Sequence, residues 1–473
     1  MIEKTDLYID GAWVAAGDVP LAEVSDAATG ETFATVPLAD AALAGRAAEA
    51  AARAFPAWAA LPPAERAAHI TRLREALKAR QEALVEMISR ETGMPRKLTG
   101  MIQVGGPLAA WKFYAELAAE TQAPKVIGNS RIYREPVGPV ACITPWNYPL
   151  HQVTSKLAAA LAAGATVVLK PSEVAPLSAF ILAEAADEAG LPAGVFNLVT
   201  GTGPEMGEAL VRHPAIAAVS FTGSTAAGKR VAALAAEGVK RVSLELGGKS
   251  AAVVLEGADL AAAVKATLGS CLLNSGQTCN AMTRLIVPEA RLGEVTELLK
   301  AGLSKFTLGA PDDPATRLGP LASAEQKTRV LAMIARAEAE SIPVIARGAD
   351  PGDRPGFFVP PVVFGPVPEA AEIAREEVFG PVLSVLVHRG TEDALRIAND
   401  SAYGLAAAVW AADDATAADA ARGIRAGQID LNGAPFNLGA PFGGFGQSGI
   451  GRENGRYGLE EFQELKSVQY KEV

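Results

Sequence analysis

The 473-residue chain is poor in histidine and cysteine and has no long apolar run. Three cysteines and four histidines are too few for a disulfide framework or a cluster of metal ligands. The longest near-apolar run, residues 157–169, is shorter than the ~20 residues that span a bilayer and contains Gly164. No basic segment followed by an apolar one opens the sequence, so no signal peptide is expected. These absences predict a cytoplasmic protein with no metal and no membrane partner.

Positive charge is also scarce. The chain has 43 Lys and Arg against 53 Asp and Glu, which leaves a net charge of −10. Nucleic-acid-binding proteins need a basic surface to hold phosphate groups, so no nucleic-acid partner is expected. Hydrophobic residues make up 49% of the chain and charged residues 20%, which is ordinary for a globular protein. The length predicts two or three domains, each with its own core.

Short β-rich runs alternate with Ala-rich helical stretches between residues 137 and 246. The expected strands cover residues 137–144, 166–170, 195–200, 217–222 and 241–246. The expected helices cover residues 156–163, 176–189, 204–212 and 225–237. Alternation at this spacing is typical of a parallel sheet with helices on both faces. The sequence therefore predicts an α/β, doubly wound fold.

Similar patterns lie on both sides of this region. Residues 62–93 carry an apolar stripe at helical spacing, which predicts one long helix that ends at Gly93. A second α/β stretch begins with an expected strand at 251–255 and an expected helix at 259–273. The tail, residues 460–473, alternates like a strand without an evident partner. Such a strand is expected to cross to another domain or subunit.

Among the three cysteines, Cys279 is the candidate nucleophile. Cys142 falls in an expected strand and Cys271 in an expected helix, so both are interpreted as inert core thiols. Cys279 instead follows an expected helix, in a polar loop that contains glycine. Because a free thiol has a pKa of ~8.5, attack at neutral pH needs help from nearby dipoles or cations. The neighbouring sequence offers no histidine for a Cys–His pair.

Glu245, at the end of an expected strand, is the candidate base. A carboxylate beside an apolar strand acts as a base when burial raises its pKa, although a surface Glu after a strand is the commoner case. A thiol that attacks a carbonyl and a carboxylate that activates water are the two groups needed to form and hydrolyse a thioester.

Three further segments follow expected strands, and each also has an ordinary structural interpretation. Asn147 is a candidate donor to an oxyanion, or part of a structural turn. Lys170 and Glu173 are placed to bind a ribose diol, or form a solvated turn. A carboxylate there repels a 2′-phosphate, which favours NAD over NADP. Gly223 opens an expected helix whose N-terminus suits a pyrophosphate, or makes a routine tight turn.

Together, seven motifs resemble the NAD(P)-dependent aldehyde dehydrogenase superfamily, in order over essentially the whole chain. They are residues 145–149, 170–173, 221–225, 245–249, 276–279, 376–381 and 441–453. The most specific pair is Glu-Leu-Gly-Gly-Lys at 245–249 and Gly-Gln-Thr-Cys at 276–279. The resemblance implies an α/β fold with a Rossmann-type cofactor domain, an α/β catalytic domain and a small bridging β element for oligomerisation.

The resemblance also implies domain boundaries. The NAD-binding domain would comprise residues 1–117 and 137–246, and the catalytic domain residues 247–447. Residues 118–136 and 448–473 would form the bridging segments, which accounts for the unpartnered terminal strand. A homodimer or a homotetramer is therefore expected.

The implied activity is NAD-dependent oxidation of a small-molecule aldehyde to the carboxylic acid. The Cys279 thiolate attacks the aldehyde carbon, and the Asn147 side chain and the Cys279 N–H hold the oxyanion. After hydride transfer to the nicotinamide, Glu245 activates the water that hydrolyses the thioester. Lys156 and Glu453 match positions near this carboxylate relay.

The positions that match cofactor contacts come from several motifs. Glu377 and Phe379 match residues that hold the nicotinamide ribose and ring, and Ser224 matches a pyrophosphate contact. The full expected set is Thr144, Trp146, Lys170, Ser172, Glu173, Gly203, Phe221, Gly223, Ser224, Leu246, Gly247, Glu377 and Phe379.

The expected substrate pocket consists of Tyr148, Gln152, Thr278, Phe436 and Phe442. Small or polar residues nearby indicate a roomy tunnel for medium-length or cyclic aldehydes, with the three aromatic residues as walls. No arginine is evidently placed for a semialdehyde carboxylate, and no aromatic cage is evident for a quaternary amine.

Three alternatives stay open at this stage. An acylating relative would pass the acyl group to coenzyme A, although Glu245 argues against it. A cysteine esterase or thioesterase would act without NAD. A non-catalytic descendant would have lost its chemistry, which the presence of Cys279 and Glu245 disfavours.

Overall fold

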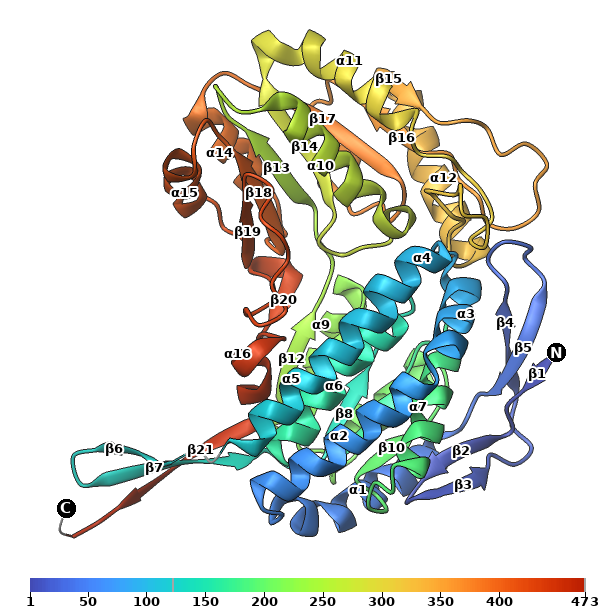
Figure 1. The fold of residues 1–473 in the computed structure, drawn as a ribbon, viewed down its shortest axis with the longest axis vertical. Helices are drawn as coiled ribbons and strands as arrows, with labels where there is room; N and C mark the ends of the chain where they lie inside the picture. Colours follow the sequence, from blue (N-terminus) through green and yellow to red (C-terminus); the bar gives the residue numbers. More distant parts are fainter. Residues whose placement is uncertain (121–122, 472–473) are drawn as a thin grey trace.

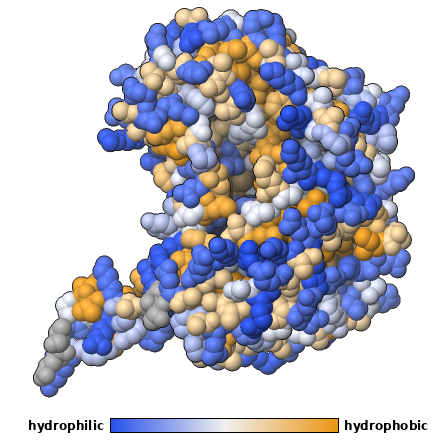
Figure 2. Space-filling view, in the orientation of Figure 1, coloured by the Kyte–Doolittle hydropathy of each residue, from blue (hydrophilic) through white to orange (hydrophobic). Residues whose placement is uncertain are grey.

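The computed structural model describes residues 1–120 and 123–471. Residues 121–122 and 472–473, which fall within the expected bridging segments, lie outside the described residues. Two large α/β sheets form the two halves of the molecule, and an antiparallel arm extends from one of them (Figure 1). The space-filling view shows the surface hollowed between the two halves (Figure 2).

The first sheet has eight strands in the order β20-β12-β11-β8-β9-β10-β2-β3. Its five central strands are parallel: β12 (Arg241–Glu245), β11 (Ala218–Thr222), β8 (Val140–Ile143), β9 (Val167–Lys170) and β10 (Phe196–Leu198). β20 (Gly449–Ile450) pairs antiparallel with β12 at one edge, and β2 (Asp6–Ile9), antiparallel to β10, forms an antiparallel pair with β3 (Ala12–Ala15) at the other. All five strands expected between 137 and 246 are present, so the α/β prediction is confirmed for this region.

Helices cover both faces of this sheet. The helical elements of this half are α1 (Ala41–Ala59), α2 (Pro63–Ala79), α3 (Gln81–Thr92), α4 (Arg96–Leu98), η1 (Thr99–Gly105), α5 (Gly106–Ala119), α6 (Pro149–Ala163), α7 (Leu177–Glu188), η2 (Gly203–Gly207), α8 (Glu208–Arg212) and α9 (Thr225–Glu237). The stretch expected as a helix at 204–212 divides into η2 and α8, and α6 begins seven residues before the expected residue 156. Pro149 at the first position of α6 suits a helix start.

The prediction of one helix over residues 62–93 is wrong, because the chain bends at Arg80 between α2 and α3. The backbone of Arg80 has φ −100° and ψ 13°, outside the helical range. Leu77 and Leu84 on either side are fully buried in the same core cluster. The apolar stripe therefore continues through the bend, and periodicity alone gives no sign of it. Gly93, with φ 77°, ends α3 as expected.

The second sheet has seven strands in the order β15-β16-β17-β14-β13-β18-β19, all parallel except β15. The strands are β13 (Ser250–Val254), β14 (Met282–Pro288), β15 (Val344–Arg347), β16 (Val362–Phe364), β17 (Val382–His388), β18 (Ala406–Trp410) and β19 (Gln428–Leu431). The helical elements of this half are α10 (Leu260–Leu272), η3 (Leu273–Gly276), η4 (Glu289–Arg291), α11 (Leu292–Leu303), α12 (Ala324–Ala339), α13 (Glu372–Arg375), α14 (Thr391–Asn399) and α15 (Asp414–Arg422).

The C-terminal strand expected from the sequence is β21 (Gln463–Gln469), and its partner lies more than 300 residues earlier. It pairs antiparallel with β7 (Ser130–Pro136), which also pairs with β6 (Lys125–Ile127) to form the arm in Figure 1. A small N-terminal sheet joins β1 (Ile2–Glu3), β5 (Thr32–Pro37) and β4 (Leu21–Ser25), and η5 (Gly446–Ser448) and α16 (Gly455–Glu460) complete the elements. Among the described residues, no helix is both long and apolar enough to cross a membrane.

Candidate active site

The carboxyl ends of the parallel strands bring distant motifs to one edge of the first sheet. Thr222 pairs with Glu245 across β11 and β12, and Ile143 pairs with Lys170 across β8 and β9. Most of the expected cofactor positions in this half end these strands or follow them within a few residues. In open α/β sheets this edge is where ligands bind.

Lys170 and Glu173 form an ion pair at this edge, with 3.1 Å between Nζ and Oε2. The Lys170 side chain is buried, while Glu173 is 37% exposed. Burial lowers the pKa of Lys170, and the Glu173 carboxylate opposes that shift. Ser172 accepts a hydrogen bond from the Val174 N–H at 3.2 Å, which holds the turn between them. A buried ammonium and a half-exposed carboxylate suit a ribose diol.

The N-terminus of α9 follows directly after β11 at the same edge of the sheet. Ser224 caps the helix, and its hydroxyl accepts from the Ala227 N–H at 3.3 Å. Gly223 sits against the Phe221 ring, where an added Cβ would come within 2.6 Å of the ring. Gly228 sits equally tightly against Leu246. The two glycines therefore make room for the Phe221 and Leu246 side chains, and the free N–H groups at the start of α9 favour an anionic group. Gly203 follows β10 at the start of η2.

The loop that carries Cys279 is held in an unusual backbone conformation. Asn274 and Ser275 have φ of 50° and 56°, in the left-handed region that non-glycine residues seldom adopt. The Ser275 hydroxyl donates to the Gly319 carbonyl at 2.7 Å. The Gln277 side chain donates to Asn274 O at 3.0 Å and accepts from the Ala322 N–H at 2.9 Å. These bonds fix the loop just before Cys279.

Asn147 is joined directly to this loop. Its Nδ2 donates to the Gln277 carbonyl, two residues before Cys279, at 3.0 Å. Its own carbonyl accepts from Asn274 Nδ2 at 2.9 Å and from Gln103 Nε2 at 3.2 Å. A side-chain amide has two N–H groups, so one remains for another acceptor. Sequence reasoning missed Gln103 and Asn274, because only their burial and contacts mark them.

The environment of Cys279 favours the protonated thiol. Burial raises its pKa first, and the carboxylates of Glu245 and Glu377 raise it further. The Asn280 N–H donates a hydrogen bond that opposes this shift. Because its pKa is raised, the thiol needs help from local dipoles or cations to lose its proton, as expected from the sequence. Gly248, whose N–H donates to Glu377, packs against the Cys279 carbonyl, where an added Cβ would come within 2.6 Å of the oxygen.

Glu245 is buried, and neither of its oxygens has a hydrogen-bond partner among residues 1–120 and 123–471. Burial and then the Glu453 carboxylate raise its pKa well above the usual value, while Lys156 and Arg452 oppose the shift. Lys156 and Glu453 form a buried ion pair. The expected group of Glu245, Lys156 and Glu453 is thus brought together. A base with a raised pKa is suited to activate water near neutral pH.

Glu377 and Phe379 face the site from the second half. Glu377 Oε1 accepts from the Gly248 N–H at 3.0 Å, and an added Cβ at Gly247 would come within 2.3 Å of its other oxygen. Burial raises the pKa of Glu377 to about 7. Phe379 has φ 56°, and its ring meets Trp146 edge-on with 5.4 Å between centroids. A bulky residue held in this conformation is typical of a functional site.

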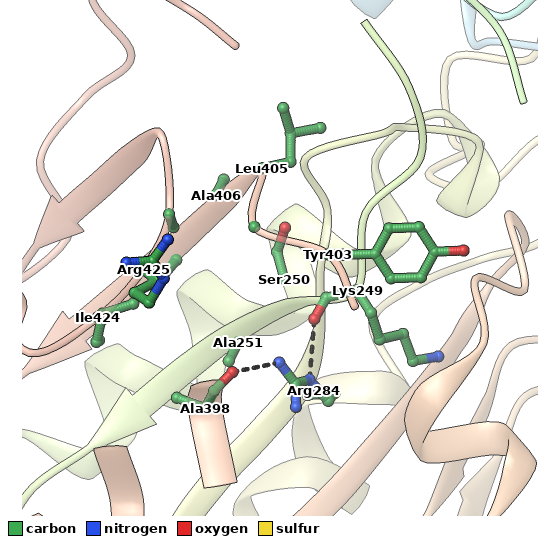
Figure 3. Close-up of a pocket in the computed structure, with 13 residues that line it drawn as sticks. Lys249, Ser250, Ala251, Arg284, Ala398, Tyr403, Leu405, Ala406, Ile424 and Arg425 are labelled. Carbon is green, nitrogen blue, oxygen red and sulfur yellow. Dashed lines mark hydrogen bonds between the residues drawn. The ribbon is translucent and has the colours of Figure 1, made fainter. Parts of the chain in front are cut away.

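The last residue of the 245–249 motif is fixed by a buried arginine (Figure 3). The Arg284 guanidinium donates to the Lys249 carbonyl at 2.9 Å and to the Ala398 carbonyl at 2.8 Å. Because Ala398 lies in the last turn of α14, Arg284 also satisfies the free carbonyls at that helix end. Burial lowers the pKa of Lys249 to about 8. Arg284 therefore fixes the end of the motif.

The expected substrate residues fall into two groups. The Tyr148 hydroxyl lies 2.8 Å from the Thr278 hydroxyl, next to Cys279, and the Gln152 N–H donates to the Tyr148 carbonyl at 2.9 Å. Phe436 and Phe442 form a separate edge-on pair with centroids 6.0 Å apart. No hydrogen bond or ring contact within the described part of the chain links this pair to Tyr148.

The fold and this group of side chains define a doubly wound α/β enzyme with a cysteine and carboxylates at its ligand-binding edge. The model of the aldehyde dehydrogenase family matches residues 13–468. A 3-succinoylsemialdehyde-pyridine dehydrogenase of Pseudomonas sp is 41% identical over 471 residues, which is 99% of each chain. Geranial dehydrogenase of Castellaniella defragrans is 40% identical over 474 residues, again 99% of each chain.

Solved structures agree with these relatives. A cysteine-to-alanine mutant of aldehyde dehydrogenase C from Pseudomonas syringae, in complex with NAD+ and octanal, is 43% identical to this chain with a TM-score of 0.96. The match covers 98% of this chain and 96% of that one. The chain belongs to the aldehyde dehydrogenase family. The predicted family, fold class and class of enzyme are therefore confirmed.

Proposed function

We propose that this aldehyde dehydrogenase oxidises its aldehyde to the carboxylic acid with NAD, through a thiohemiacetal and a thioester on Cys279. One observation carries the proposal: the Asn147 side chain is hydrogen-bonded to the Cys279 loop with a second amide N–H to spare, and the buried Glu245 carboxylate acts electrostatically on the Cys279 thiol. A nucleophile, an oxyanion donor and a base are thus supplied by three separate segments.

The first half of the reaction forms the covalent adduct. The Cys279 sulfur, once it has lost its proton, attacks the aldehyde carbon, and the carbonyl oxygen becomes an oxyanion. The free N–H of Asn147 and the backbone N–H of Cys279 stabilise this charge. The carbonyl re-forms when hydride leaves, which yields the thioester.

The second half hydrolyses that thioester. Glu245 takes a proton from a water molecule, which attacks the acyl carbon and releases the acid and the Cys279 thiol. The buried pair of Lys156 and Glu453 provides the next groups along a route for this proton. Overall, aldehyde, NAD+ and water become acid, NADH and a proton.

The strand edge fits NAD. The proposed holding groups are the Lys170–Glu173 pair for the adenosine ribose, the α9 N-terminus for the pyrophosphate, and Glu377 with Phe379 for the nicotinamide ribose and ring. When bound, NAD accepts the hydride. The Glu173 carboxylate disfavours a 2′-phosphate, so we propose that NAD is preferred over NADP. The Pseudomonas syringae structure in complex with NAD+ and octanal supports this assignment of cofactor and substrate class.

We further propose a homodimer or homotetramer built through the arm, with the domain boundaries given above and a cytoplasmic location. The arm supports oligomerisation because it exposes apolar side chains: Val126 is 58% exposed, Ile127 56% and Leu465 65%. Exposed apolar strands are typical of surfaces that another chain covers.

The decisive experiment is a panel of aldehydes assayed at the NADH absorbance band with NAD or NADP. Medium-length aldehydes with NAD are expected to give NADH and the free acid. Acyl-CoA product on addition of coenzyme A would favour the acylating alternative. Ester hydrolysis with no NADH from any aldehyde would favour the cysteine esterase and refute the proposal.

A further inference from the structure

The peptide that carries Asn147 is held by two amide side chains from different parts of the chain. Its carbonyl oxygen accepts from Gln103 Nε2 at 3.2 Å and from Asn274 Nδ2 at 2.9 Å. A carbonyl oxygen has two lone pairs, and these two donors use both. On its other side, Asn147 Nδ2 donates to Gln277 O at 3.0 Å. Both the backbone and the side chain of Asn147 are therefore fixed.

We propose that Gln103 is a positioning residue for the reaction. Its amide orients the Asn147 peptide so that the free side-chain N–H of Asn147 donates to the substrate oxyanion. This inference rests on the proposed function, because it assumes that Asn147 is the oxyanion donor. Gln103 itself acts only through Asn147.

The chemistry of Gln103 does not suit a purely structural role. Its side chain is fully buried, and its Oε1 has no hydrogen-bond partner among the described residues. Within the described part of the chain, the one other hydrogen bond of its side chain is a long one, 3.4 Å, to the Met94 sulfur. Burying a polar side chain that has an unsatisfied hydrogen-bond acceptor is less favourable than burying a leucine side chain. Stability alone would favour an apolar side chain here, so the donated hydrogen bond accounts for the glutamine.

The backbone around Gln103 supports the same interpretation. Gln103 lies in η1, a π-helix between α4 and α5. An extra residue per turn is uncommon in helices and is frequently found at functional sites. Asn274 supplies the second donor from the Cys279 loop, in a left-handed conformation that asparagine tolerates better than most residues. The two donors thus fix the position of Asn147, the proposed oxyanion donor, relative to the loop that carries Cys279.

The test is a double-mutant cycle with Gln103→Leu and Asn147→Ala, measured in single turnover so that slow variants remain measurable. Loss of an oxyanion donor lowers rates by ~10²–10³-fold, and we expect a displaced donor to lose roughly 10-fold in kcat/KM for aldehyde. The affinity for NAD should not change. In the Asn147→Ala background, Gln103→Leu should cause no further loss, because the group through which it acts is gone.

Thr99→Val is the matched control. Thr99 lies in the same π-helix and is equally buried. Among the residues that the structure describes, its hydroxyl donates only to the Met94 and Pro95 carbonyls, at 3.0 and 3.3 Å. Removing its hydroxyl should leave kcat/KM of the folded enzyme unchanged in both backgrounds. Should Gln103→Leu fail to fold, Gln103→Met and Asn274→Gly carry the same test, since glycine accepts the left-handed conformation of Asn274.

Two results would overturn the proposal. An equal loss from Gln103→Leu in both backgrounds would mean a structural role, and an unchanged kcat/KM would mean no role in positioning. Full activity of Asn147→Ala alone is a different outcome, because it would also remove the oxyanion donor from the proposed function.

Discussion

Lys156 and Glu453 form an ion pair in the interior of the protein, and after burial their two charges have the largest effects on the pKa of Glu245. The Lys156 side chain is fully buried, and Glu453 is 7% exposed. Water screens charges at this depth very little, so both charges act strongly on Glu245. The pH dependence of catalysis should therefore report on this pair.

Replacing Glu453 with Gln is expected to shift the pH profile of deacylation to lower pH. The Glu453 carboxylate raises the pKa of Glu245, whereas the Lys156 ammonium lowers it. The substitution removes the first effect and keeps the second, so Glu245 loses its proton at lower pH. Deacylation needs the deprotonated form of Glu245, so its rate rises as the pH passes through the pKa of Glu245. Glu464→Gln, an exposed carboxylate paired with Arg241, is the control and should leave the midpoint in place. A midpoint that moves upward would contradict this account.

Cys279→Ala should abolish aldehyde oxidation while NAD binding persists. The sulfur is the only group proposed to bond to substrate, so no NADH should form with any aldehyde in the panel. Binding of NAD is measured by calorimetry on the same preparation. Cys271→Ala serves as the control, because the Cys271 thiol is fully buried and donates a hydrogen bond to Val382 O at 3.4 Å, its one partner in the described part of the chain. Turnover that survives in Cys279→Ala would refute the assignment of the nucleophile.

Glu245→Gln should trap the acyl-enzyme. Loss of a general base lowers a rate by ~10²–10⁴-fold, and here the loss should fall on hydrolysis rather than on thioester formation. Intact mass spectrometry should then find the acyl group on the protein, after a burst of one NADH per site. The Glu245→Gln, Cys279→Ala double variant should show neither. Steady-state turnover equal to that of the unmodified enzyme would remove Glu245 as the base.

Glu173→Gln should weaken the preference for NAD over NADP by roughly 5- to 10-fold. This is the size of effect expected when the repulsion between one half-exposed carboxylate and a 2′-phosphate is removed. The change should appear as a lower KM for NADP, because the repelled group is the 2′-phosphate. Glu184→Gln, which removes a similarly half-exposed carboxylate paired with Lys4, provides the comparison. If the ratio of kcat/KM for the two cofactors stays constant, Glu173 does not face the ribose.

Much of the site was accessible from the sequence because its chemistry depends on residue types at strand ends. Glu245 ends β12 and Lys170 ends β9, as their patterns predict. Cys279 could be separated from Cys142 and Cys271, because the latter two lie in a strand and a helix and are fully buried. These are local properties, and alternation of apolar residues reports them directly.

Other features depended on contacts that no periodicity reveals. The bend at Arg80 escaped prediction because α2 and α3 bury their stripes in one core. Gln103 and Asn274 reach Asn147 across 44 and 127 residues of sequence, and only folding makes them neighbours.

The sequence by itself determined the family, the alternating α/β pattern and the reactive side chains, because these follow from residue type and local spacing. The tertiary structure decided which buried charges surround Glu245, which amides hold Asn147, and that β21 pairs with β7. Charge interactions and hydrogen bonds act over a few ångströms in space and are indifferent to separation along the chain.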